Sequence, residues 1–297
     1  MKAFLRKLIF WICSGLLFAA CIEWLAGNEQ NDYTRKYEVL KHAEADTLIL
    51  GSSHSFYGVT ANGLDRGDSY NMSWSSQTLD ETFWVANEAP SQTHLFICIS
   101  PFTLASTVNN RVELWRNAYF NRTFHWISSN PKELSFFLSR GGRNILKMAR
   151  NGIIKIGPSR IDVAGNGNHE GSVESLAHSA DEACTRHFRN ATSKKLEQQL
   201  IDLSKRENTT FFTPPFHQSY LDCIEKQSLW QKTLSILDSL ARARPIEYLN
   251  YSALQLPDSF FYDADHLNRD GQIAFSEILL RDEGIKSLSE DHALQQP

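Results

Sequence analysis

Short apolar runs alternate along the chain with longer segments whose apolar residues recur at helical spacing. Five of these runs predict buried strands, over residues 46–50, 69–74, 94–100, 208–213 and 247–251. Pro101 ends the third run and Pro214 ends the fourth, because proline has no N–H to donate to a neighbouring strand.

The segments between these runs predict helices. Leu196, Leu200 and Leu203 fall at i, i+4 and i+7 and give one apolar face before the fourth strand. Further helices are predicted over about 78–87, over 229–240 and after a loop at 263–268. Strands that alternate with helices of this length indicate a parallel sheet covered on both faces. The sequence therefore predicts a doubly wound, three-layer, flavodoxin-like α/β fold.

One long segment, over about residues 102–180, interrupts this alternation. A gap of that length is too long for a connecting loop. The segment predicts a mostly helical insertion with a flexible tail in the part that is rich in glycine and asparagine, residues 165–171. Because it follows the carboxyl end of a strand, the insertion is expected to overhang the crevice where ligands bind in open α/β sheets.

The N-terminal segment differs from the rest of the chain. Lys2, Arg6 and Lys7 precede a run of fifteen uncharged residues, 8–22. A bilayer crossing needs roughly 20 residues, and counting on to residue 27 reaches that length with Glu23 near the far interface. A basic flank before an apolar run predicts an N-terminal membrane helix over residues 1–27, with residues 28–297 on the periplasmic or extracytoplasmic side.

Two other interpretations of this segment remain open. Ala19, Ala20 and Cys21 after an apolar run resemble a lipoprotein signal, and the segment also has features of a cleaved secretory signal. Each of the three interpretations exports the rest of the chain.

Composition and charge narrow the function classes. An apolar fraction of 42%, with 7 Trp, 9 Tyr and 18 Phe, indicates a globular protein and excludes a disordered one. The net charge is -4, with both signs interspersed and no basic tract, so no nucleic-acid partner is expected.

The cysteines bear on location and on metal binding. Cys98 lies in an apolar run and is expected to be buried. Cys184 and Cys223 could pair in an oxidising compartment or remain two free thiols. No Cys-x-x-Cys pair occurs, so the sequence gives no support for a zinc or redox site, and neither a metal nor another cofactor is expected.

The segment Gly51-Ser52-Ser53-His54-Ser55 directly follows the first predicted strand. A serine at a junction between a strand and a helix suits a nucleophile, because N–H groups at a helix start can stabilise a developing oxyanion. Such a serine needs a base that accepts its proton. A serine at this position can also simply cap the helix.

A second candidate segment, residues 261–268, contains Asp263 and His266 in a loop after the last strand. An aspartate three residues before a histidine can hold one ring nitrogen while the other faces a hydroxyl. Three alternatives remain: Asp265 or Asn268 caps the next helix, the loop binds calcium, or Asp263, Asp265 and His266 bind a metal. A calcium loop would need a closing glutamate, which the sequence lacks, and further metal ligands are not evident.

Taken in order, these motifs resemble the SGNH/GDSL hydrolase superfamily. Residues 51–54 resemble its first block, with Ser53 as the nucleophile, and Asp263 and His266 resemble its last block, as orienting acid and base. Residues 71–77 resemble its second block, which makes the backbone N–H groups of Ser53 and Ser76 the expected oxyanion hole. The pairing is similar to bacterial envelope members related to the D-alanine transfer protein and to alginate O-acetylation proteins.

The resemblance implies an SGNH hydrolase fold and an acyl-ester enzyme of the cell envelope. Its activity would be that of an esterase, a deacetylase or an O-acyltransferase, and its partner an acylated glycan or cell-surface polymer. The alternative is a non-catalytic scaffold of the same fold that binds a glycan or a membrane partner. One difference from the family's motifs supports that alternative. The third block of the family carries an asparagine that donates to the oxyanion, and this chain has Ser100 and Pro101 there.

Three further residues are candidates for substrate contact. Ser100 could replace the missing asparagine of the third block. His54 could bind substrate, support the nucleophile turn or pack against Tyr57, and His217, after the fourth strand, could bind substrate or cap a helix.

Overall fold

The computed structural model describes residues 2–27, 32–42, 45–61, 68–105, 161–188, 193–244 and 246–293. The chain divides into two units, one of residues 1–37 and 108–159 and one of residues 38–107 and 160–297. The predicted helical insertion falls largely on residues 106–160, which lie outside the described residues. The second unit contains the sheet.

All five predicted strands are confirmed. They are β1 (Thr47–Leu50), β2 (Ser69–Asn71), β3 (His94–Cys98), β4 (Thr209–Thr213) and β5 (Glu247–Asn250). The strands pair in parallel in the order β2-β1-β3-β4-β5, which is the flavodoxin-like arrangement. In this order the chain reverses its direction of winding after β2, so a crevice is expected between the carboxyl ends of β1 and β3.

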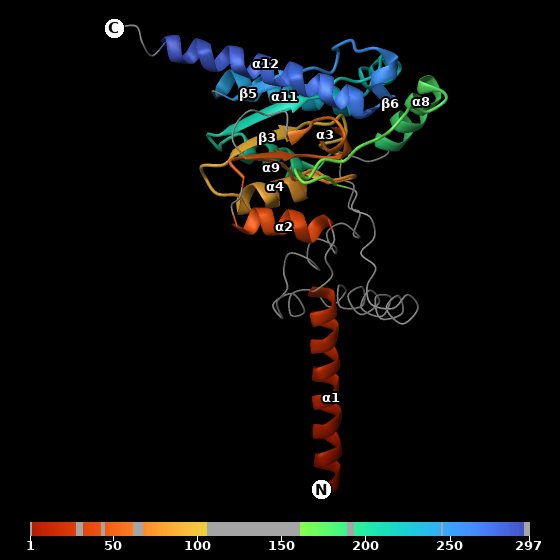
Figure 1. Cartoon of the computed structure of the whole chain (residues 1–297), viewed down its shortest axis with the longest axis vertical. Helices are drawn as coiled ribbons and strands as arrows, with labels where there is room; N and C mark the ends of the chain where they lie inside the picture. Colours follow the sequence, from red (N-terminus) through yellow and green to blue (C-terminus); the bar gives the residue numbers. More distant parts are fainter. Residues whose placement is uncertain are drawn as a thin grey trace. The chain divides into compact units, whose positions relative to one another are not determined.

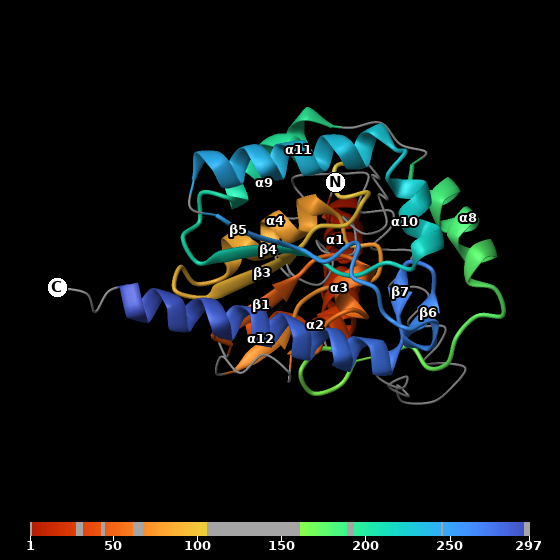
Figure 2. The same cartoon turned by 90° about the horizontal axis from the view of Figure 1, so that it is seen from above.

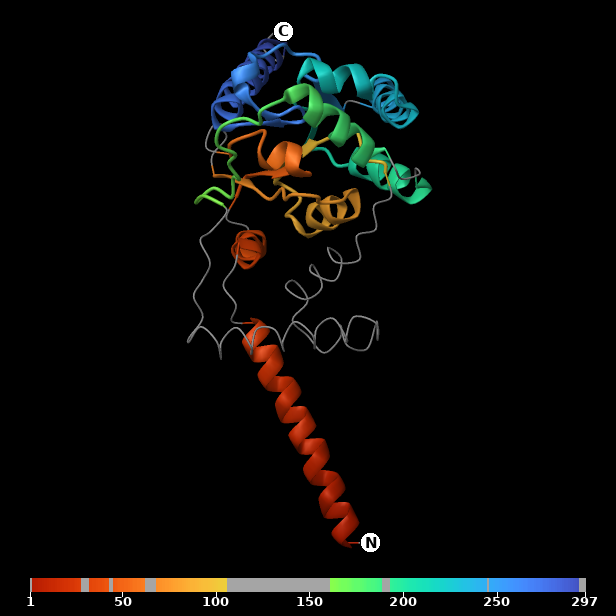
Figure 3. The same ribbon diagram turned by 90° about the vertical axis from the view of Figure 1, so that its right-hand side faces the viewer.

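Side chains that alternate along the strands fill two separate cores. Leu48, Leu95 and Phe211 belong to the core shared with helices α4 (Leu79–Glu88), α9 (Lys194–Leu203) and α11 (Ser228–Ala243). Their neighbours along the strands, including Ile49 and Phe212, pack against α12 (Arg269–Ala293). Figure 1 shows α12 on one side of the strands and α4 and α9 on the other, and the side view of Figure 3 agrees. The three-layer α/β prediction is confirmed.

The predicted helices form where the sequence places their caps and apolar faces. Thr78 caps α4, and its backbone N–H is bonded in turn by the side chain of Glu81, a reciprocal pair that fixes the helix start. The three leucines predicted for α9 are all buried. The side-chain oxygen of Asn268 accepts from the N–H of Gly271 at 3.1 Å at the start of α12, so Asn268, not Asp265, caps this helix.

Several shorter elements lie at the carboxyl end of the sheet, and no bounds were predicted for them. They are α3 (Ser53–Phe56), α8 (Leu176–His187), α10 (Gln218–Ile224), the 3-10 helix η2 (Asp258–Phe260) and the antiparallel strands β6 (Phe261–Asp263) and β7 (His266–Leu267). Figure 2 shows α8, α10 and the β6–β7 hairpin gathered at one side of the molecule, beside α3. The strands of two or three residues and the helices of one or two turns, α3 and α10, are too short to give a periodic pattern.

The tail of the predicted insertion differs from the expectation. Residues 165–171 were predicted to be flexible, but they belong to the α/β unit. The N–H of Asn71 donates to the carbonyl of Ala164 at 2.8 Å, and the buried side chain of Asn166 accepts from the N–H of Ala61 at 2.8 Å. The reason is that asparagine in this segment satisfies backbone groups in the fold, which composition alone does not reveal.

The N-terminal helix α1 forms over Lys2–Gly27. Among the helices of the described residues, none combines the length and the apolar character that a bilayer crossing requires. The predicted membrane-spanning role of this segment is therefore not confirmed.

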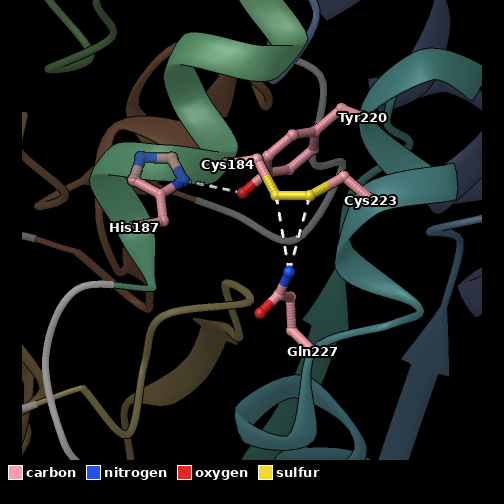
Figure 4. Close-up of a disulfide and its surroundings, with 5 residues drawn as sticks. All are labelled: Cys184, His187, Tyr220, Cys223 and Gln227. Atoms are coloured by element: carbon pink, nitrogen blue, oxygen red, sulfur yellow. Dashed lines mark hydrogen bonds between the residues drawn. A yellow bond between two sulfur atoms is a disulfide. The ribbon is translucent and has the colours of Figure 1, made fainter.

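A disulfide joins Cys184 of α8 to Cys223 of α10, with a Cα–Cα distance of 6.5 Å. The alternative of two free thiols at these positions is wrong. The amide nitrogen of Gln227 lies 3.8 Å from the sulfur of Cys184 and 3.7 Å from that of Cys223 (Figure 4). Cys98 is buried, as predicted. The bond fastens together the two helices that border one side of the carboxyl end of the sheet.

Candidate active site

The turn after β1 presents Ser53 at the start of α3. Ser52 is the N-cap, and its hydroxyl oxygen lies 3.4 Å from the N–H of His54 that donates to it. Ser55 braces the turn from behind, because its hydroxyl bonds to the carbonyl of Ser52 at 3.1 Å and to the hydroxyl of Ser73 at 2.8 Å. Ser53 therefore projects from a turn whose backbone is held on several sides.

Gly51 makes this turn possible. Its φ is +147°, in the region that side chains rarely adopt, and a Cβ placed on it would lie 2.6 Å from Ser55 Oγ and 2.7 Å from Cys98 Cβ. We expect Gly51→Ala to lower the free energy of unfolding by about 2–4 kcal/mol, because it adds backbone strain and a steric clash. Urea denaturation measures this loss.

Gly171 is the matched control for that substitution. It also has a positive φ, of 74°, but a Cβ there would meet nothing within 4 Å, so Gly171→Ala tests backbone strain alone. Gly51→Ala that is no more destabilising than Gly171→Ala would contradict the role assigned to the close packing around Gly51.

The β6–β7 hairpin brings His266 to Ser53. Nε2 of His266 lies 2.8 Å from Oγ of Ser53, and Nδ1 lies 2.9 Å from Oδ1 and 3.1 Å from Oδ2 of Asp263. The carboxylate of Asp263 accepts from Nδ1–H, which leaves Nε2 as the acceptor that faces the hydroxyl. Oδ1 of Asp263 also accepts the backbone N–H groups of His266 and Asp265, so this carboxylate is fixed by its own loop. The three predicted catalytic residues thus lie together.

Two carboxylates control the charge of His266. Burial lowers the pKa of His266. The charge of Asp265, and then the hydrogen bond and charge of Asp263, together raise this pKa by more than burial lowers it, so the net pKa lies above the ordinary value. Oδ1 of Asp265 is 3.5 Å from Nδ1. A raised pKa means that this site stabilises the imidazolium that forms when His266 takes a proton.

The second expected oxyanion donor, Ser76, lies in the turn after β2 and is exposed. Its φ is 61°. The N–H of Trp74 in the same turn donates to the carbonyl of Gly51 at 3.3 Å, so the turn is attached to the nucleophile segment.

Ser100 does not face outward from the end of β3. It is 1% exposed, and its hydroxyl lies 2.7 Å from that of Ser52 and 2.8 Å from Nδ1 of His54. The backbone N–H of Ser100 donates to Thr103 Oγ1, which turns the chain at this strand end. The hydroxyl of Ser100 is therefore engaged by Ser52 and His54, and its contact with substrate stays a prediction.

The two remaining substrate candidates also have internal roles. His54 is 2% exposed and bonds through Nε2 to Asp265 at 3.2 Å, so it supports the nucleophile turn, one of the alternatives given for it. His217 follows its capping alternative: it is the N-cap of α10, where Nδ1 accepts from the N–H of Ser219, and Nε2 lies 3.2 Å from Asp258.

The sequence did not identify several residues that lie around His266. Asp265 is a buried carboxylate and not a helix cap. His187 of α8 bonds to the hydroxyl of Tyr220 at 2.6 Å (Figure 4) and lies 3.7 Å from Asp265. The Asp-x-Asp-His spacing was the available signal for Asp265, whereas nothing near position 187 indicates its role.

Three stacked aromatic rings, those of Tyr57, His169 and Tyr262, lie beside His266. The ring of His169 lies 3.7 Å from that of Tyr57 and 4.0 Å from that of Tyr262, and 5.8 Å from the ring of His266 (centroid distances). Burial and the nearby charge of His266 lower the pKa of His169 to about 4, so this ring is neutral at neutral pH. His169 is about a hundred residues from each of its stacking partners in the chain, so no local pattern marks it.

His54, Asp265 and His266 are the group in the described residues whose ligand atoms lie close enough together to hold a metal, within 4.8 Å of one another. Their nitrogen and oxygen atoms already pair with each other and with Ser53, Ser100 and Asp263. The donor set therefore fits a hydrogen-bonded network, and the absence of a metal cofactor stays a prediction.

The positions of Ser53, His266 and Asp263 define the candidate active site. Comparison with models of protein families and with curated proteins finds no match to this chain.

Proposed function

We propose that this protein is an acyl-ester enzyme of the SGNH type: an esterase, deacetylase or O-acyltransferase that acts on an acylated glycan or cell-surface polymer. The observation that carries the proposal is the alignment of Ser53, His266 and Asp263, with 2.8 Å from hydroxyl to Nε2 and 2.9 Å from Nδ1 to carboxylate. A hydroxyl, an imidazole and a carboxylate in this order are the components of serine acyl transfer.

The reaction has two halves. Oγ of Ser53 attacks the acyl carbonyl carbon while His266 Nε2 takes the hydroxyl proton, and Asp263 holds Nδ1–H and stabilises the imidazolium. Backbone N–H groups of Ser53, at the start of α3, and of Ser76 bind the oxyanion. The alkoxide leaves with the proton from His266. In the second half, water (hydrolysis) or a sugar hydroxyl (transfer) attacks the acyl carbon of acyl-Ser53 and gives its proton to His266, and the bond to Ser53 breaks as Oγ takes that proton back.

Two further observations support the family and the location. The strand order, a nucleophile directly after β1 and an Asp-His hairpin before the last helix agree with the SGNH arrangement. The disulfide between Cys184 and Cys223 is typical of proteins outside the cytoplasm, because thiols stay reduced inside it. An extracytoplasmic location is therefore part of the proposal, and how the protein attaches to a membrane stays a prediction.

A second candidate function is a non-catalytic scaffold of the same fold that binds a glycan or a membrane partner. The observation that favours it is the buried hydroxyl of Ser100, which leaves the strand end after β3 without a side-chain oxyanion donor. Loss of one such donor lowers kcat by about 10²–10³.

A fluorophosphonate probe separates the two candidates, because covalent labelling requires an activated serine. We expect the full-length protein to be labelled on the peptide that contains Ser53, and His266→Gln to slow the labelling. Heat-unfolded protein controls for non-specific reaction. A folded wild-type protein that takes up no label at Ser53 would favour the scaffold.

A further inference from the structure

Behind the proposed catalytic residues lies a second carboxylate that their mechanism does not use. Asp265 is 3% exposed, and its two oxygens face in different directions. Oδ1 lies 3.5 Å from Nδ1 of His266, and Oδ2 lies 3.2 Å from Nε2 of His54. A buried carboxylate is costly unless it is paired, and each oxygen of Asp265 faces a histidine nitrogen.

We propose that Asp265 is a positioning residue that places a fixed negative charge against His266 and, through His54, orients the turn that carries Ser53. This inference deepens the proposed function and rests on it, because it assigns Asp265 a role toward the same nucleophile and base.

The hydrogen bonds that link Asp265 to the turn before Ser53 all donate toward the carboxylate. A carboxylate only accepts, so Nε2–H of His54 donates to Asp265 and its Nδ1 is then an acceptor. Nδ1 accepts the hydroxyl of Ser100 at 2.8 Å, and Ser100 Oγ accepts the hydroxyl of Ser52 at 2.7 Å. Ser52 caps α3 and directly precedes Ser53. The chain of bonds therefore runs from the carboxylate to the residue next to the nucleophile.

The neighbours of Asp265 leave its charge available to His266. Burial lowers the pKa of His54, and it lowers that of His187 to about 3, so both rings are neutral at neutral pH. Burial also keeps the hydroxyl of Tyr220 protonated by raising its pKa. Among the described residues the remaining cation on this side is Arg186 of α8, 3.7 Å from Oδ2; its side chain is 63% exposed, so solvent weakens its charge and it offsets that of Asp265 only in part.

The carboxylates of Asp263 and Asp265 act on His266 in different ways. Asp263 makes the direct hydrogen bond to Nδ1 and so fixes the tautomer, as the third member of a triad does. Asp265 adds charge at 3.5 Å without taking that proton. Burial raises the pKa of Asp265, but the charge of His266 and the bond from His54 lower it below the ordinary value, so the carboxylate is ionised.

The test compares Asp265→Asn with Asp181→Asn, which removes one exposed carboxylate from α8. His266 must be neutral to act as a base, so kcat/KM for nitrophenyl acetate rises with pH through the pKa of His266. Without the charge of Asp265 that pKa falls, and we expect the acid limb of the profile to move about one unit toward lower pH. The value of kcat/KM at high pH is expected to fall about tenfold. Asp181→Asn should leave both unchanged.

Titration of the His266 ring by NMR measures the same shift without any substrate, with His266→Gln to assign the signal. If the ring titrates about one unit lower in Asp265→Asn but no variant hydrolyses the ester, the positioning role stands and the proposed function fails. If the protein is active and neither the limb nor the ring titration moves, the inference is overturned.

Arg186→Gln provides a second variant at an exposed position, which keeps the test decisive if Asp265→Asn does not fold. The charge of Arg186 lowers the pKa of His266, so its removal is expected to move the ring titration in the opposite direction, toward higher pH. A His266 titration that is unchanged or lower in folded Arg186→Gln would also overturn the inference.

Discussion

Ser53→Ala is expected to lower kcat for ester hydrolysis by a factor of about 10⁴–10⁶. The substitution removes the one hydroxyl that lies 2.8 Å from Nε2 of His266, so no acyl-enzyme can form. KM should change little, because the methyl group of alanine leaves the turn and the N–H donors in place. Turnover of nitrophenyl acetate by the full-length protein measures the effect.

Two comparisons make this result specific. Ser239→Ala removes an exposed hydroxyl that bonds only within α11, to the carbonyl of Ser235, and should leave kcat unchanged. Ser53→Ala combined with His266→Gln should be about as slow as either single variant, because the two residues act as one unit. A wild-type rate indistinguishable from that of Ser53→Ala would remove the enzymatic claim for this ester.

Replacement of both Cys184 and Cys223 by serine is expected to lower the free energy of unfolding by about 4 kcal/mol. The two cysteines are 39 residues apart in the sequence, and the bond restricts the unfolded chain by closing a loop of that length. In the folded state it also holds α8, which carries His187 and Arg186 beside Asp265. Urea denaturation under non-reducing conditions measures the loss.

Reductant is the control for this prediction. A thiol reductant should lower the stability of the wild-type protein toward that of the double variant and leave the variant itself unchanged. Cys13→Ser, at an exposed free cysteine, should have no effect. Wild-type protein whose unfolding midpoint is the same with and without reductant would contradict the prediction.

The sequence by itself determined the sheet. Each strand is a run of apolar residues whose neighbours point to opposite faces, and Leu48 and Ile49 show why this works: they enter different cores, so both positions must be apolar. The nucleophile and the Asp-His pair were also predictable, since each is a short motif at a strand end. Their meeting follows from the parallel order, which brings the carboxyl ends of the strands to one edge.

Tertiary structure decided what surrounds those motifs. Ser100 and His54 were candidates for substrate contact, with support of the nucleophile turn as an alternative for His54, and the fold buries both and joins them to Asp265, 211 residues from His54 in the chain. The pairing of Cys184 with Cys223 likewise depends on α8 and α10 lying side by side. Local patterns record whether a position is apolar or begins a helix, because those preferences act between near neighbours. Which buried polar groups satisfy one another depends on contacts between distant segments, and these exist only once the hairpin and the helices have packed.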